Sequence, residues 1–127
     1  MVIDRRGPLM GSTPASTALL LFEIDTPLIH LKRKLGAQAA ERAWLRSKGA
    51  LDALYDLTRR EKIDAAVSLR PSVYLAGTQL DARALEMEAK ARERLGLPSH
   101  FLDRQALRTR FGLSRSAAIV KIGRAHV

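Results

Sequence analysis

A change of periodicity within residues 37–77, AQAAERAWLRSKGALDALYDLTRREKIDAAVSLRPSVYLAG, decides the fold class. Up to about Lys62 the apolar residues recur at helical spacing, and we expect Trp44 and Tyr55 to be core residues of that helix. From Ala65 onward, AAVSL and SVYLAG are rich in β-branched and aromatic residues, which predicts two short strands separated by Arg70–Pro71. The helical stripe consists of Ala40, Trp44, Ser47, Leu51, Leu54 and Thr58.

Two further helices are predicted after the strands. Asp81 is a capping residue for a charged helix that runs to about Leu95, and Asp103 caps a short helix that Gly112 ends. Within the first of these helices, Glu86–Lys90 and Glu88–Arg92 are spaced as ion pairs worth a few tenths of a kcal/mol each. The stretch SAAIV, residues 116–120, then predicts a strand.

Before the long helix, the sequence predicts a strand, a loop and two helices. Val2–Ile3 is typical of a strand end, and Gly7, Pro8 and Gly11 break regular structure. Ser12 or Thr13 is then expected to cap a helix that has Pro14 in its first position. Thr26–Pro27 has the same pattern for a second helix, which Gly36 ends. The whole order predicts a chain of mixed α and β structure.

The composition limits the classes of protein. The chain has 127 residues and no cysteine, which fits one domain in a reducing, cytoplasmic compartment. The apolar run Ala18–Phe22 is closed by Glu23 and Asp25, so we expect neither an export signal nor an integral membrane segment. The net charge is +9, but arginines alternate with acids along helical stretches, so we favour solvated faces over nucleic-acid binding. A complete, small basic module that binds nucleic acid stays open as the alternative, and it predicts salt-dependent affinity.

The tail KIGRAHV, residues 121–127, breaks the pattern of the preceding sequence. The codons ATC GGA AGA GCA CAC GTC encode IGRAHV and resemble a widely used sequencing-adapter oligonucleotide, whose next triplet is a stop. The two preceding adapter bases complete a codon for Lys121. We therefore expect residues 1–120 to be the protein domain and residues 121–127 to derive from the adapter, which leaves His126 without functional weight.

An acid at a strand end, followed by a loop of small residues, is typical of dinucleotide binding, where the acid bonds the ribose hydroxyls. Asp4 and the loop after it have this pattern. GSTPASTALLLFEIDTPL (residues 11–28), RPSVYLAG (70–77) and DRQALRTRFG (103–112) resemble the FAD-dependent oxidoreductases of the D-amino acid oxidase and glycine oxidase type. The resemblance covers about residues 1–120.

The resemblance implies a flavoprotein that oxidises an amino acid or another amine, and it assigns the cofactor contacts to the first loop. Asp4 would bind ribose, Arg5 and Arg6 would lie beside the adenosine, and small residues would line the pyrophosphate and the isoalloxazine. Hydroxyl residues in this loop also suit helix capping and turns, and both interpretations stay open. The small residues of the loop are Ser12, Thr13, Ala15, Ser16 and Thr17. The resemblance assigns no catalytic residue.

The family pattern also includes GxGxxG on an earlier strand, and no three glycines of this chain have that spacing. The resemblance therefore implies a truncated FAD/NAD(P)-binding, Rossmann-like fold with a helical, substrate-side segment, inactive as this fragment. Arg70, Tyr74 and Arg110 are candidates to face a substrate carboxylate, although RPSVYLA is equally well explained as a packing hairpin. His30 and His100 lack metal-ligand spacing, and we expect no metal site.

Overall fold

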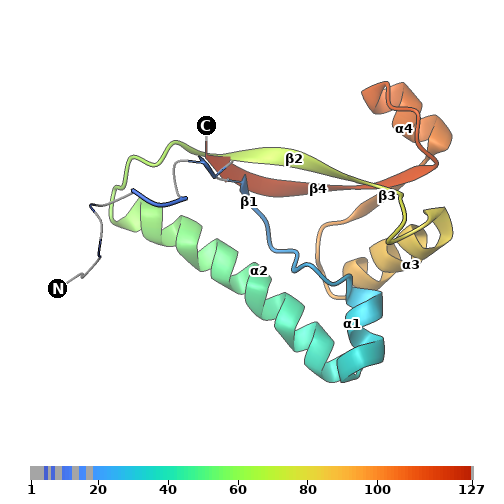
Figure 1. Ribbon diagram of the computed structural model, residues 1–127, viewed down its shortest axis with the longest axis horizontal. Helices are drawn as coiled ribbons and strands as arrows, with labels where there is room; N and C mark the ends of the chain where they lie inside the picture. Colours follow the sequence, from blue (N-terminus) through green and yellow to red (C-terminus); the bar gives the residue numbers. More distant parts are fainter. Residues whose placement is uncertain (1–4, 6, 8–9, 13–14, 17–18, 127) are drawn as a thin grey trace.

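The computed structural model describes residues 5, 7, 10–12, 15–16 and 19–126 (Figure 1). The expected strand end at Val2–Ile3 lies outside these residues. In chain order, the elements are β1 (Leu19–Leu20), α1 (Leu28–Leu35), α2 (Ala37–Arg60), β2 (Val67–Leu75), α3 (Ala82–Glu93), β3 (His100–Asp103), α4 (Arg104–Phe111) and β4 (Ala117–His126). The prediction of mixed α and β structure is confirmed.

The sheet is antiparallel and is organised around β4. Strand β2 pairs with β4 along one edge, from Val67 opposite His126 to Leu75 opposite Ala118. Strands β3 and β1 share the other edge of β4, with β3 at the beginning of β4 and β1 near its end. The predicted strand SAAIV is confirmed, and β4 continues beyond it through the expected boundary after Val120. The origin of residues 121–127 stays a prediction.

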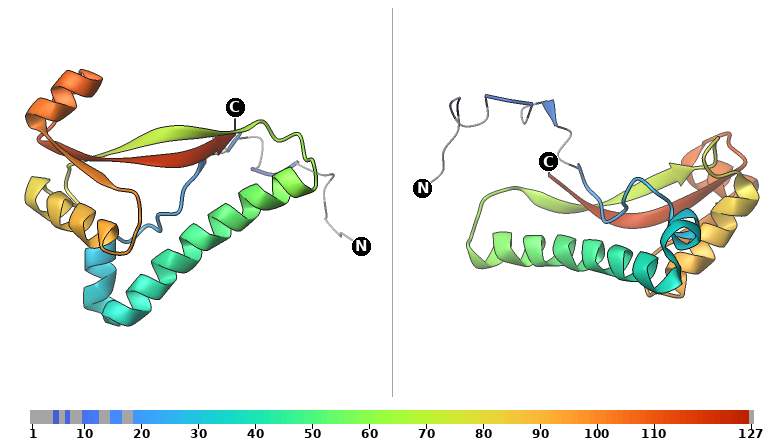
Figure 2. Two further views of the ribbon diagram at one scale, coloured as in Figure 1. Left: turned by 180° about the vertical axis from the view of Figure 1, so that it is seen from behind. Right: turned by 60° about the horizontal axis from the view of Figure 1, so that its bottom comes forward.

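The helices surround one end and one side of this sheet. Helices α1 and α3 stand together at one end, α2 runs alongside the sheet, and α4 projects beyond β3 (Figures 1 and 2). In the part of the chain that the structure describes, no helix has the length and apolar character needed to cross a membrane.

The expected pair of strands around Arg70–Pro71 is wrong, because β2 passes through Pro71 without interruption. The N–H of Ala76 donates to the carbonyl oxygen of Ala117 at 2.9 Å, so residue 76 faces β4. Successive residues of a strand direct their backbone groups to opposite edges, which places Pro71 on the open edge. A proline nitrogen on an open edge removes no hydrogen bond between β2 and β4. Strand β2 therefore continues through Pro71, where the sequence predicted an interruption.

The expected helix after Ser12 is also wrong. Thr13 and Pro14 lie outside the described residues, but Leu19–Leu20 form β1, and a bent, non-helical backbone follows to Pro27. Burial along this stretch alternates: Phe22 is fully buried, whereas Leu21 is exposed. A short apolar run fits either a strand or a helix, and here pairing with β4 selects the extended form.

The described core contains two apolar clusters that meet at α3. The first surrounds Trp44, whose ring meets Phe22 edge-on with 6.2 Å between centroids, and the second packs under the start of β4. Burial of Trp44 is confirmed, but Tyr55 is only partly buried. The apolar stripe of α2 is buried through Leu51, whereas Leu54 is 42% exposed. The part of α2 up to Leu51 therefore supplies most of its packing.

The predicted boundaries of the later helices agree with the structure. Asp81 accepts a hydrogen bond from Ala84 N at 2.8 Å, and Asp103 accepts one from Ala106 N at the same distance. Gly112 ends α4 in the left-handed conformation, with φ 68°, which glycine adopts without steric cost.

Replacing Asp81 with alanine removes the cap of α3, so we expect the free energy of unfolding to fall by about 1 kcal/mol. Urea denaturation measures this change. Asp81→Asn is the matched control: its side-chain oxygen still accepts from Ala84 N, and we expect a loss of only a few tenths of a kcal/mol. Equal losses in the two variants would contradict the capping role.

Candidate functional site

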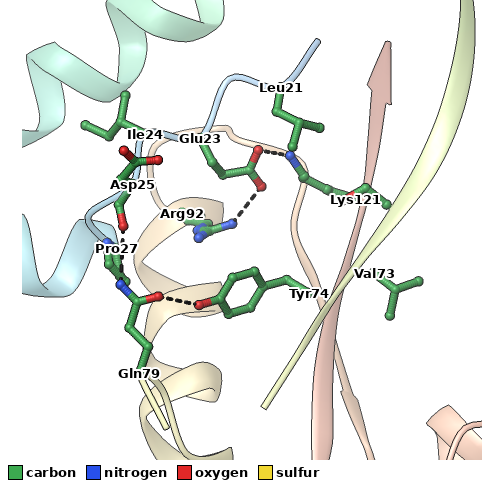
Figure 3. Close-up of a pocket in the computed structure, with 11 residues that line it drawn as sticks. Leu21, Glu23, Ile24, Asp25, Pro27, Val73, Tyr74, Gln79, Arg92 and Lys121 are labelled. Atoms are coloured by element: carbon green, nitrogen blue, oxygen red, sulfur yellow. Dashed lines mark hydrogen bonds and ion pairs between the residues drawn. The ribbon is translucent and has the colours of Figure 1, made fainter. Parts of the chain in front are cut away.

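A pocket of about 430 Å³ lies between the loop of residues 21–27, strands β2 and β4, and the end of α3 (Figure 3). Its walls combine apolar side chains with four charged ones. The lining residues are Leu21, Glu23, Ile24, Asp25, Pro27, Ser72, Val73, Tyr74, Gln79, Arg92 and Lys121. This pocket is our candidate functional site.

Glu88 forms the buried base of the charged cluster behind this pocket. Its carboxylate accepts hydrogen bonds from Leu28 N and Ile29 N, both at 2.9 Å, and from Arg92 Nε at 2.7 Å. Helix α1 has no side-chain cap of its own, so the expected cap at Thr26 is wrong. A carboxylate from α3 caps α1 instead, where it also meets the positive end of the helix dipole.

Arg92 connects this carboxylate to the pocket. Its Nη1 lies 3.1 Å from Glu23 Oε1, while its guanidinium lies 4.6 Å from the centroid of the Trp44 ring. The Glu88–Arg92 pair was expected to contribute only a few tenths of a kcal/mol, but Glu88 is 0% exposed and Arg92 only 2%, so the pair is buried. An arginine fits this position because its planar group can bond two carboxylates and stack on an aromatic face at once.

Lys121 enters the pocket from β4 and forms an ion pair with Glu23 Oε2 (Figure 3). Its Nζ also lies 4.7 Å from the centroid of the Phe22 ring. The side chain is almost completely removed from solvent. Because burial disfavours the charged form, it lowers the pKa of the Lys121 amine to about 8.

A chain of neutral hydrogen bonds forms the opposite wall. The Tyr74 hydroxyl donates to Gln79 Oε1 at 2.8 Å, and Gln79 Nε2 donates to the backbone oxygen of Asp25 at 3.2 Å. Figure 3 shows Gln79 joined by dashed lines to Tyr74 and to Asp25. This chain fixes the 21–27 stretch against β2, so the two walls of the pocket are held at a set separation.

The charged side chains of this pocket could bind a polar ligand and exchange protons with it. The charges of Glu23 and Glu88 are balanced by those of Arg92 and Lys121. The Asp25 side chain is exposed at the rim. Among the described residues, no group of three histidine, cysteine or acidic side chains could hold a metal ion.

The cofactor contacts predicted from the sequence do not line this pocket. Arg5 and the described loop residues are exposed. Ala15 N donates to Ser12 O at 3.0 Å, which is turn geometry. The remaining predicted contacts, Asp4, Arg6, Thr13 and Thr17, lie outside the described residues.

Of the three candidates for a substrate carboxylate, only Tyr74 lines the pocket. Arg70 is exposed on β2, and the Arg110 guanidinium lies 5.4 Å from the Phe111 ring on α4. His30 is partly buried and His100 is exposed. The structure therefore does not bring the two arginines together at this site.

Sequence reasoning missed the charged cluster, although α3 contains a signal for it. Glu88 and Arg92 share the spacing i, i+3, i+4, i+7 with the buried residues Leu85 and Ala89, so all four lie on one face. A charged pair on the apolar face of a helix indicates burial. Glu23, between Phe22 and Ile24, carries a similar but weaker signal.

No protein-family model, curated protein or solved structure matches this chain. The family resemblance in the sequence therefore stays a prediction.

Replacing Glu88 with glutamine should lower the free energy of unfolding by about 3–5 kcal/mol, because it leaves Arg92 as a buried charge with one carboxylate fewer. Urea denaturation measures the loss. Glu86→Gln is a control from the same helix: its ion pair with Lys90 is exposed and should contribute less than about 0.5 kcal/mol. Similar losses in both variants would show that the Glu88 cluster does not stabilise the fold.

The pKa of Lys121 predicts a rise in stability with pH. Between about pH 8 and the ordinary lysine pKa of 10.5, the unfolded chain binds more protons at this amine than the folded chain does. We therefore expect the free energy of unfolding of the wild type, relative to that of Lys121→Met, to increase across this interval. Urea denaturation at several pH values measures the difference, and a flat or falling difference would contradict a lowered pKa.

Proposed function

We propose that this chain is part of an FAD-dependent oxidoreductase that oxidises an amino acid or another amine. The proposal rests on the resemblance of its sequence to the D-amino acid oxidase and glycine oxidase type. One structural observation supports it: two of the three resembling stretches, EIDTPL and RPSVYLAG, contribute walls to the same pocket. Stretches that are distant in sequence but converge on one cavity are typical of a ligand site.

In this proposal the pocket receives the amine substrate. Its volume lies within the range of small-molecule sites. The Asp25 carboxylate, at the rim, would pair with the substrate ammonium, while Tyr74 and the apolar side chains Leu21 and Ile24 would contact its side chain. FAD would supply the hydride chemistry, and the residues of this chain would bind and orient the substrate.

The fit of the described loop to FAD is poor. Pyrophosphate is commonly bound by backbone N–H groups at the N-terminus of a helix. Among the described residues of this loop, Ala15 lies in a 3₁₀ turn and Leu19–Leu20 form β1, and Ser12, Ala15 and Ser16 are exposed. We therefore propose that a Rossmann-like unit with GxGxxG, outside this sequence, would complete the cofactor site of a cytoplasmic enzyme. No catalytic step is derived through FAD here.

Titrating the 127-residue chain with FAD tests whether it binds the cofactor by itself. We expect no sub-micromolar binding and no shift of the flavin absorption spectrum, because this sequence lacks the GxGxxG turn that holds the pyrophosphate in the family. Absorption and fluorescence of the flavin measure both quantities. Tight binding with a shifted spectrum would contradict the proposed need for a further unit.

The genomic reading frame tests the family itself. In-frame upstream codons for a strand and GxGxxG would support the oxidoreductase. A frame without them, together with salt-dependent binding of DNA or RNA by the chain, would favour the small basic module instead.

A further inference from the structure

The pocket carries one carboxylate that no cation of the chain balances, and its cations are already engaged with other carboxylates. We propose that the pocket selects a primary alkylamine without a carboxylate and excludes amino acids. The choice of substrate rests on the proposed function and narrows its substrate class. The binding of the ligand itself needs no flavin.

Asp25 supplies the carboxylate that is free to bind a cation. Its backbone oxygen accepts a hydrogen bond from Gln79 Nε2 at 3.2 Å, which holds residue 25 at the wall of the pocket. In the described part of the chain, no cation pairs with the Asp25 carboxylate. An ammonium group has three N–H donors and no acceptor, which matches a carboxylate. An alkylammonium therefore supplies the positive charge that this wall lacks.

Arg92 offers little to the carboxylate of a ligand, because two carboxylates of this chain already share its charge. Its Nε lies 2.7 Å from Glu88 Oε1, and its Nη1 lies 3.1 Å from Glu23 Oε1. The guanidinium also lies 4.6 Å from the centroid of the Trp44 ring. An amino acid would have to place its carboxylate near Glu23 without a free cation to pair with. Desolvation of an unpaired carboxylate is costly, so the zwitterion is disfavoured.

The balance of charge does not require the lysine at position 121. The pocket and the cluster behind it contain three carboxylates, Glu23, Asp25 and Glu88, but only two cations, Arg92 and Lys121. Lys121 pairs with Glu23, so it offers no free charge to a ligand either. A neutral residue at position 121 would make the excess of negative charge larger. The preference for a cation is therefore the same whatever the origin of residues 121–127.

The apolar walls of the pocket indicate an aliphatic ligand. Leu21 is 40% exposed and Ile24 is 36% exposed, and both line the pocket with Val73. An alkyl chain bound against these side chains would remove apolar surface from water. The Tyr74 ring also lines the pocket, and the face of an aromatic ring attracts cations. A short alkylammonium satisfies both the free carboxylate and the apolar walls.

Titrations of the 127-residue chain with three matched probes at neutral pH test this selection. Norleucine is pentylammonium with a carboxylate on the carbon that bears the amine, and hexanoate is norleucine without its amine. Shifts in ¹H–¹⁵N NMR spectra locate binding at the lining residues and give the dissociation constants. We expect pentylammonium to bind at least about tenfold more tightly than norleucine, and hexanoate to shift no lining residue. Norleucine binding as tightly as pentylammonium, or pentylammonium leaving the lining residues unshifted, would overturn the proposal.

Asp25→Asn tests the free carboxylate, because the amide keeps its size and removes its charge. We expect the affinity for pentylammonium to fall about three- to fivefold, and the affinity for uncharged 1-pentanol to stay the same. Asp56→Asn is the matched control, because Asp56 is exposed on α2 and does not line the pocket. This control should bind pentylammonium as the wild type does. Equal losses in the two variants, or no loss in Asp25→Asn, would contradict the role of Asp25.

The outcomes separate this selection from the proposed function. Selective binding of pentylammonium by a chain whose genomic frame lacks an upstream GxGxxG would support the amine site and contradict the oxidoreductase. Norleucine binding as tightly as pentylammonium, in a chain whose frame encodes GxGxxG, would overturn the selection and leave an oxidoreductase that acts on amino acids.

Discussion

The carboxylate of Glu88 is the constraint on which the rest of the structure depends. It fixes the N-terminus of α1 through the N–H groups of Leu28 and Ile29, and it fixes Arg92 on its own helix. Arg92 then reaches Glu23, which meets Lys121 on β4. One charged cluster therefore links two helices, the loop of residues 21–27 and the central strand of the sheet.

The position of this cluster explains why the molecule tolerates charges in its interior. Helix α3 contacts both apolar clusters: Leu85 and Ala89 pack under the sheet, while Ala91 and Leu95 pack toward Trp44. The Glu88–Arg92 pair lies on α3 between the two apolar clusters. Its hydrogen bonds fix how the clusters meet, which apolar contacts alone would not specify. Desolvation of each charge is offset only while every partner is in place, so the cluster is sensitive to the loss of one member.

The sequence correctly predicted the features that depend on interactions between neighbouring residues. The length of α2, the caps at Asp81 and Asp103, and the end of α4 at Gly112 each depend on residues a few positions apart, and they agree with the structure. Strand β1, the cap of α1 and the burial of Glu88 depend on contacts with distant residues, which periodicity does not report. The pocket was missed for the same reason, because its walls come from separate elements.

Pro71 affects how readily one copy of this protein pairs with another through the edge of its sheet. It lies on the open edge of β2, where an uninterrupted row of backbone donors would be a template for a strand from another chain. A proline in the middle of that row removes one donor, and the exposed Arg70 beside it adds charge. The longest open strand of the described sheet thus carries its own protection against edge-to-edge aggregation.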